Sequence, residues 1–234
     1  MRRVEHVMGF PVSLRVDDEG IGDEVADALF AWLREVDARF SPFRPDSEVC
    51  RYDRGELQLR DLSADLTEVL DLCEQYRLAT GGAFDVRLPG RPLDPCAVVK
   101  GWSVQRAAEL LTAAGARRFI LNAGGDVVVA GGPWRVGVRH PEHADQLCTV
   151  LELTDGAVAT SGYGAEVVDP HTGQVIHSRG PATVTGPTLA VADGFATALF
   201  AAADAGLRWF DGTSGYEPLV VAGHPVKGML TPAA

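Results

Sequence analysis

The chain has 234 residues, of which 46% are hydrophobic and 23% are charged, which is the composition of a globular protein with a sizeable core. Its formal net charge is −11 at pH 7, which argues against nucleic acid or an anionic membrane surface as the main partner. An anionic ligand would therefore need local help from a metal ion, a few basic residues or backbone N–H groups.

The first residues carry no targeting signal that we recognise. Arg2 and Arg3 are followed by Val4, Glu5 and His6 rather than by an apolar run, so we expect no signal peptide. No segment looks long enough to span a bilayer, and four widely spaced cysteines without a CxxC pair favour reduced thiols. We therefore expect a cytoplasmic protein with no membrane insertion.

A strand, a helix and a proline-containing loop are expected within the first 50 residues. Apolar side chains alternate over residues 10–16, which predicts a strand, and they recur at helical spacing over residues 23–40, which predicts a helix. Two prolines and two serines predict a rigid loop over residues 41–49 that leads into a short strand or turn. This loop either shapes the wall of a ligand site or is structural, with Ser47 capping a turn and Phe43 in the core.

A further helix is expected to begin after Ser63, which is a good N-cap residue. Glycines at positions 81 and 82 should end this helix, and an extended stretch over residues 83–86 should follow. Three prolines then predict a loop over residues 87–95.

The next predicted helix is amphipathic and covers residues 102–114. Lys100 ends an apolar turn just before it, which is an unusual place for a charge. This lysine is either a phosphate contact at the start of a helix or an exposed lysine of its first turn.

The second half of the chain is expected to be rich in strands. Alternating apolar residues separated by polar turns predict an antiparallel meander. The expected strands cover residues 118–121, 127–130, 133–139, 146–153 and 157–159, with a glycine turn over residues 122–126.

The last third combines short strands with one long helix. Residues 160–164 are small and polar enough to expose backbone N–H groups to a ligand. Together with the earlier elements, the pattern predicts an α+β fold of antiparallel sheets flanked by helices, with two sheet-and-helix halves around residue 115. The remaining expected elements are a strand and turn over 167–173, a strand over 182–185, helical residues 207–210 and a hairpin over 216–222 and 226–230.

The helix expected after Thr188 carries two polar side chains that interrupt its apolar face. Asp193 and Thr197 are four residues apart, so both project from one side of the helix, one turn apart. A carboxylate and a hydroxyl stacked in this way offer two hard oxygens to a small cation such as Mg²⁺. The alternative is a solvated Asp193 and a Thr197 hydroxyl that bonds back to a carbonyl one turn earlier.

A series of short motifs runs through nearly the whole chain, and in this order the motifs resemble those of the FAD:protein FMN transferases, the ApbE family. The resemblance implies one ApbE-like domain over residues 1–234, with two sub-halves around a single FAD cleft. The matching motifs are Met8-Gly9, Phe40-Ser41, Ser47-Glu48-Val49, Thr80-Gly81-Gly82-Ala83-Phe84-Asp85, Asp94, Lys100-Gly101, Asn122, Gly124-Gly125-Asp126, Ala159-Thr160-Ser161-Gly162, Asp169-Pro170, Thr172-Gly173, Asp193 and Ala196-Thr197.

The resemblance implies an enzyme that binds FAD and Mg²⁺, with Mn²⁺ as an alternative metal. Such enzymes transfer FMN through its phosphate onto a Thr or Ser hydroxyl of an acceptor flavoprotein and release AMP. The family's metal ligands match Asp193, Thr197 and, through the backbone carbonyl before the motif lysine, Val99; Asp193 also counts as catalytic. The matching cofactor-binding positions are Met8, Ser41, Phe43, Phe84, Asp85, Asp94, Lys100, Gly162 and Val167.

The chain departs from the family pattern at two places. The usual Asp-Leu-Gly-Gly-Ile-Ala-Lys-Gly is Asp94-Pro95-Cys96-Ala97-Val98-Val99-Lys100-Gly101, in which Pro95 and Ala97 stiffen and fill a turn that is normally glycine-rich. The second departure is Glu166, which stands where the family often has a histidine for which a role as catalytic base has been proposed. A carboxylate acts as a base when its pKa is raised, but it also repels the phosphates of FAD.

Three functions are therefore open. The chain is an Mg²⁺-dependent FMN transferase, an FAD pyrophosphatase that makes FMN and AMP, or an FAD-binding protein that has lost catalysis. The altered turn before Lys100 and the carboxylate of Glu166 are the arguments for the third.

Overall fold

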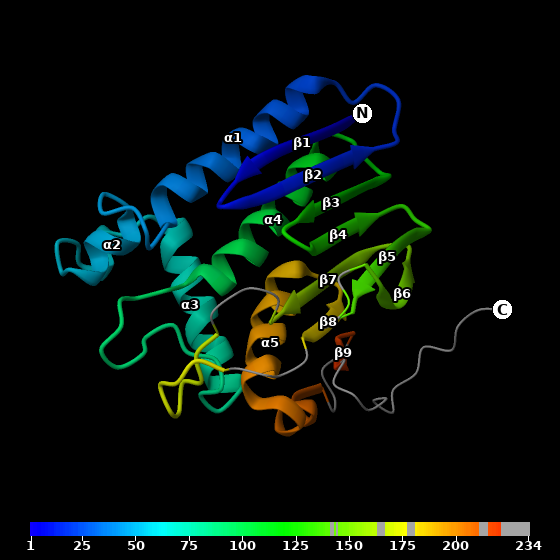
Figure 1. Ribbon diagram of the computed structural model, residues 1–234. Helices are drawn as coiled ribbons and strands as arrows, with labels where there is room; N and C mark the ends of the chain where they lie inside the picture. Colours follow the sequence, from blue (N-terminus) through cyan, green and yellow to red (C-terminus); the bar gives the residue numbers. More distant parts are fainter. Residues whose placement is uncertain (141–142, 144, 163–166, 177–180, 211–214, 221–234) are drawn as a thin grey trace.

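One seven-stranded antiparallel sheet is the base of the fold in the computed structural model, which describes residues 1–140, 143, 145–162, 167–176, 181–210 and 215–220. The strand order is β1-β2-β3-β4-β7-β8-β9, so strands from both sides of residue 115 join one sheet (Figure 1). The strands are β1 (Arg2–Val7), β2 (Phe10–Val16), β3 (Phe119–Ala123), β4 (Asp126–Ala130), β7 (Gly156–Ser161), β8 (Ala182–Gly186) and β9 (Glu217–Val220).

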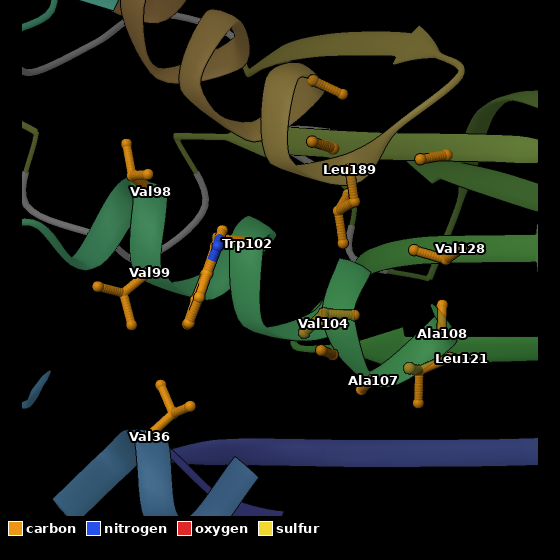
Figure 2. Packing of buried hydrophobic residues seen from close by; sticks show 14 of the residues in the cluster. Val36, Val98, Val99, Trp102, Val104, Ala107, Ala108, Leu121, Val128 and Leu189 are labelled. Carbon is orange, nitrogen blue, oxygen red and sulfur yellow. The ribbon is translucent and has the colours of Figure 1, made fainter. Parts of the chain in front are cut away.

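Helices cover one face of this sheet, and α4 lies in the middle of their layer (Figure 1). It packs against α1, α3 and α5, and its valines, alanines and Trp102 meet Val36 of α1, Leu121 of β3 and Leu189 of α5 (Figure 2). The helices are α1 (Asp23–Phe40), α2 (Glu48–Asp53), α3 (Ala64–Ala79), α4 (Cys96–Ala113) and α5 (Leu189–Ala202), with short 3₁₀ turns at η1 (Leu59–Asp61) and η2 (Ala203–Phe210).

A separate hairpin of β5 (Trp134–Arg139) and β6 (Leu147–Leu153) covers part of the other face. Its inward side chains form a second apolar cluster with Val127 and Val129 of β4 and Val158 of β7. Val128 points the other way, into the main core. Strand β4 is therefore buried on both faces, which fixes its register firmly because a shift by one residue would exchange the two sets of side chains.

Several expected elements are confirmed. The strand over residues 10–16 and the helix over residues 23–40 have the predicted bounds. Ser63 is the N-cap of α3, where its hydroxyl accepts a hydrogen bond from the N–H of Leu66 at 3.2 Å. The α+β class is also confirmed, and all four cysteines are free thiols.

Three expectations in the first half are wrong, and one strand was not predicted. Residues 2–7 form this edge strand, and their alternation of charged side chains suits a strand with one exposed face. Residues 48–53 form a helix capped by Ser47, not a strand or turn, and residues 83–86 form no strand. Helix α4 begins at Cys96, so Lys100 lies in its second turn rather than at a helix start.

The predicted meander is also wrong in its connections. Strand β4 pairs with β7, and the hairpin between them forms its own two-stranded sheet. Of residues 167–173, only Val168 makes a bridge, to Val175. Strand β9 agrees with the first half of the predicted final hairpin, while residues 226–230 lie outside the described part of the chain.

One apolar stretch is longer than expected. Residues Leu189–Phe210 form 22 consecutive helical residues, and the most apolar window of 18 of them has a mean hydropathy of 1.3, so the length expectation is wrong. In the fold, however, 61% of this stretch's most apolar window is buried. The stretch combines α5 with η2, and α5 packs on β7 and β8, which is how the core helix of a globular protein is placed.

We expect the replacement Ser63→Ala to lower the free energy of unfolding by about 1–2 kcal/mol, because the N-terminal N–H groups of α3 lose their cap. The Ser63 hydroxyl also donates to the Glu48 carboxylate at 2.8 Å, which ties α2 to α3. Chemical denaturation measures the loss, and Ser63→Thr, which keeps the hydroxyl, is the matched control. An equal loss in both variants would contradict the capping role.

Candidate functional site

Three charged side chains from distant parts of the chain meet where α4, α5 and β4 converge. The ammonium nitrogen of Lys100 lies 2.7 Å from Oδ2 of Asp126 and 3.6 Å from Oδ1 of Asp193. Both carboxylate side chains are only 1% exposed, whereas the Lys100 side chain is 24% exposed. The lysine therefore lies nearer the solvent, with two buried acids beside it.

Asp193 projects from the buried part of α5. This helix packs against α4, β7 and β8, and the turns around Asp193 are made of buried alanines and a glycine. The alternative of a solvated Asp193 is therefore wrong. Thr197, one turn later, is half-buried, and its hydroxyl is 2.9 Å from the hydroxyl of Ser161 at the end of β7.

The two acids differ in how their oxygens are satisfied. Oδ1 of Asp126 accepts a hydrogen bond from the N–H of Thr160 at 2.9 Å, so β7 holds this carboxylate in place. Neither oxygen of Asp193 has a hydrogen bond within the described part of the chain, and Oδ2 of Asp126 has none either, although the Lys100 ammonium forms an ion pair with both acids. Burying carboxylate oxygens without hydrogen bonds is costly, and Asp193 has two such oxygens where Asp126 has one.

The charges of the cluster do not balance, because two acids face one base. Burial raises the pKa of the Asp193 carboxyl; the ammonium of Lys100 opposes this effect and the Asp126 carboxylate adds to it. Burial alone would lower the pKa of Lys100, but Asp193 and Asp126 outweigh it and raise that pKa above its ordinary value. Lys100 is therefore charged, and a proton or a cation must balance the second acid.

Helices α4 and α5 approach each other most closely at Gly101. A Cβ atom there would lie 2.7 Å from Cβ of Asp193 and 2.8 Å from the carbonyl oxygen of Leu189. Both distances are shorter than real contacts, so only glycine permits this approach. Gly101 thus lets α4 bring Lys100 against Asp193.

Asp193 and Thr197 fit the ligand set of a hard divalent cation. If Thr197 donates its hydroxyl hydrogen to Ser161, the lone pairs of its oxygen are free to face a metal. Val99 lies in the first turn of α4, directly before Lys100, as the expected carbonyl ligand requires. Within the described residues, no three His, Cys, Asp or Glu side chains form a metal cluster, so such an ion would also rely on substrate and water oxygens.

Two other predicted residues, Met8 and Gly162, contact or adjoin these elements. Met8 occupies the turn between β1 and β2, and its sulfur lies 3.8 Å from the Ser103 hydroxyl of α4. Gly162 directly follows Ser161, with φ of 109°, and a side chain there would collide with Phe200 of α5. Gly162 therefore packs closely against α5, one residue after the serine whose hydroxyl contacts Thr197.

Phe84, Asp85 and Asp94 have mainly structural contacts. Phe84 is buried and meets the ring of Tyr76 edge-on, and Tyr76 in turn packs against Phe195 of α5. The carboxylates of Asp85 and Asp94 accept hydrogen bonds from backbone N–H groups two residues later in the chain. These contacts shape the loops at the start of α4.

The structure places Ser41 and Phe43 in the turn between α1 and α2. The Ser41 hydroxyl accepts a hydrogen bond from the N–H of Phe43 at 3.2 Å, and the Phe43 ring is 85% exposed. Its alternative place in the core is therefore wrong. The carbonyl of Val167 accepts a hydrogen bond from Ile176 at 2.8 Å, and Glu166 lies outside the described residues.

Asp126 and Ser161 belong to two of the sequence motifs named above, but no functional role was predicted for either residue. The signal at Asp126 was a charged residue that opens a strand of consecutive valines, which is where a buried acid needs a partner. Ser161 ends a small, polar run and carried no comparable signal.

Comparison with known proteins identifies relatives over most of the chain. The ApbE family model matches residues 8–90 and 87–219. An FAD:protein FMN transferase of Haemophilus influenzae is 23% identical over 82% of this chain and 78% of its own length. Another, of Rhodobacter capsulatus, is 28% identical over 80% of this chain but only 36% of its own length.

Two solved structures share the fold. The flavin transferase ApbE from Vibrio cholerae gives a TM-score of 0.80 at 20% identity, covering 94% of this chain and 96% of that one. The ApbE protein from Thermotoga maritima gives a TM-score of 0.80 at 21% identity, with 94% of each chain covered. The expected ApbE-like α+β fold is confirmed.

In metal-free solution, we expect Asp193→Asn to raise the free energy of unfolding by about 1–3 kcal/mol, because it removes a buried and unpaired carboxylate. The folded protein holds a proton at Asp193 that the unfolded chain releases. The unaltered protein should therefore lose stability as the pH rises above the ordinary carboxyl pKa of about 4, and the variant should not. Denaturation in EDTA at several pH values measures the difference. A loss of stability at every pH would contradict the absence of a partner for Asp193.

Proposed function

The chain belongs to the ApbE family, and we propose that it is an Mg²⁺-dependent transferase that moves FMN from FAD onto a Thr or Ser hydroxyl of an acceptor flavoprotein and releases AMP. The names of the curated relatives, FAD:protein FMN transferase, support the reaction. The observation that carries the proposal is the buried carboxylate of Asp193, which has no hydrogen bond among the described residues and lies one turn from the Thr197 hydroxyl.

The charge of the site supports a diphosphate substrate. Asp126, Asp193 and Lys100 together carry −1 when ionised, and a divalent cation would change this to +1. The cluster would then attract the diphosphate of FAD in a protein whose net charge is otherwise −11. When bound, Mg²⁺ or Mn²⁺ supplies charge neutralisation at the phosphate oxygens.

The proposed step breaks the phosphoanhydride bond of FAD and forms a phosphoester bond to the acceptor. The acceptor hydroxyl oxygen forms a bond to the phosphorus of the FMN half, and the bond from that phosphorus to the bridging oxygen breaks. AMP leaves with the bridging oxygen. Glu166 is the proposed base that takes the hydroxyl proton, which is then released to solvent or to AMP. Lys100, partly exposed at the mouth of the cluster, would face the phosphates.

We assign the other predicted residues to the walls of the FAD site. Met8, next to Ser103 of α4, and the backbone N–H of Gly162, next to Ser161, are the proposed contacts to the flavin or the phosphates. The exposed ring of Phe43 offers an aromatic face to a ring of FAD. Phe84, Asp85 and Asp94 would act by shaping the loop before α4. Ser41 would fix the turn at Phe43 through its hydrogen bond. Val167 directly follows Glu166 in the chain and would act as its neighbour in the FAD site.

The proposed acceptor is a flavoprotein, and the proposed location is the cytoplasm, in agreement with four unpaired thiols. Incubation with FAD, Mg²⁺ and a flavin-free candidate acceptor tests the function. Covalent flavin on the acceptor with AMP in equal amount is the expected result. Free FMN and AMP would indicate a pyrophosphatase, and unchanged FAD would indicate a binding protein without catalysis.

In the same assay, we expect Thr197→Val to raise the Mg²⁺ concentration needed for half-maximal activity, because the shape is kept and a ligand oxygen is lost. Thr112→Val is the matched control, since the Thr112 hydroxyl donates back to the Ala108 carbonyl within α4, away from the charged cluster. Asp193→Ala should abolish turnover at limiting Mg²⁺. An unchanged Mg²⁺ requirement in Thr197→Val, with only its melting temperature lowered, would remove Thr197 from the metal site.

If Glu166 is the base, Glu166→Gln should keep FAD affinity and lower turnover by about 10²–10⁴-fold, because an amide cannot take the proton. Measuring FAD affinity and turnover separates this role from simple repulsion of phosphate. Tighter FAD binding with no loss of rate, and a faster Glu166→His, would indicate repulsion. No change in either variant would place Glu166 outside the site.

A further inference from the structure

Lys100 is shared unequally between its two acidic neighbours. Its ammonium nitrogen is 2.7 Å from Oδ2 of Asp126 but 3.6 Å from Oδ1 of Asp193, so the ion pair with Asp126 is the closer of the two. The lysine thus lies nearer to the acid on β4 than to the acid on α5. Neither oxygen of Asp193 has a hydrogen bond among the described residues, and its ion pair with the lysine is the longer one.

Asp126 is built to keep this position. It opens β4, a strand buried on both faces, and its Oδ1 accepts the N–H of Thr160 from the neighbouring strand β7. Its Oδ2 is then directed to Lys100. The carboxylate is 1% exposed, so water does not compete for it.

Without Asp126, the ammonium of Lys100 would have one acid within reach. It would move onto Asp193 and become a resident competitor for any metal ion, because opposite charges in a buried site pair closely. A divalent cation would then have to displace the ammonium before it could bind.

We infer that Asp126 is a positioning residue: it holds the ammonium of Lys100 away from Asp193 and so keeps that carboxylate available to a divalent cation. The inference rests on the proposed function, since it concerns the metal that Asp193 and Thr197 would hold. It assigns Asp126 a role through Lys100 and no contact with substrate.

Two other roles for Asp126 make different predictions. If Asp126 only anchors β4 to β7, its replacement should change stability and leave metal affinity unchanged. If it only adds negative charge near the metal, its replacement should weaken metal binding equally whether or not Lys100 is present. Only a role through Lys100 makes the effect depend on the lysine.

The test is a double-mutant cycle of Asp126→Asn and Lys100→Met, with Mn²⁺ binding measured by electron paramagnetic resonance in the absence of FAD. Asparagine suits the purpose because its amide oxygen still accepts the N–H of Thr160. We expect Asp126→Asn to weaken Mn²⁺ binding by about tenfold in the protein with Lys100, and by clearly less in the Lys100→Met background. An equal or larger effect without the lysine, or no effect with it, would overturn the inference.

Asp18→Asn is the matched control. The Asp18 carboxylate also accepts backbone N–H groups, from Arg117 and Arg118, beyond the end of β3 opposite to Asp126. It should leave Mn²⁺ affinity unchanged. Denaturation in EDTA checks that every variant is folded.

The same measurement separates this inference from the proposed function. Mn²⁺ binding that Asp193→Ala abolishes, combined with equal effects of Asp126→Asn in both backgrounds, would reject the positioning role and keep the metal site. No Mn²⁺ binding by the unaltered protein without FAD would reject the positioning role, while the transfer assay with FAD and Mg²⁺ would still decide the proposed function.

Discussion

Two buried carboxylates and a single ammonium meet at the crossing of α4 and α5, and the rest of the site depends on this imbalance of charge. A core of this kind normally excludes an acid without a full set of partners. The protein retains one at Asp193, where burial makes every electrostatic interaction stronger than it would be in water. Burial of the Asp193 carboxylate thus lowers the stability of the fold, and the same burial would strengthen the attraction of this carboxylate for a cation.

The surrounding fold keeps this arrangement rigid. Gly101 permits the close approach of α4 and α5, and the first turn of α5 is fixed from both sides. The Leu189 N–H donates to the Gln105 side chain of α4, and the Tyr76 hydroxyl of α3 donates to the Ala190 carbonyl. Asp193 therefore lies one turn beyond a firmly held helix start. Its carboxylate would keep the same position whether or not an ion is bound.

Local patterns in the sequence predicted much of this fold. Helical spacing gave the bounds of α1, a cap residue gave the start of α3, and the spacing of Asp193 and Thr197 placed both on one side of α5. The ApbE-like fold followed from ordered motifs. The partner of each strand was less accessible, because alternation in β5 does not reveal that this strand leaves the main sheet.

The errors at the site have a common cause. The sequence analysis placed Lys100 at a helix start because the amphipathic pattern was recognised only from residue 102, yet the helix begins at Cys96 directly after Pro95. Whether Asp193 was solvated or buried depended on α4 and β4, which are distant in sequence. No local sequence pattern indicates that Asp126, Lys100 and Asp193 lie next to one another in the fold.

That long-range assembly has a consequence for how the protein would acquire the proposed metal. The three charged residues belong to segments that come together only when β4 has joined the sheet and α5 has packed against it. A chain still emerging from the ribosome has no α5 and therefore no charged cluster. If the cluster holds the proposed metal, loading would follow folding, and an ion that binds only the native chain would shift the folding equilibrium toward that state. Depletion of that metal would then lower the amount of folded protein as well as its rate.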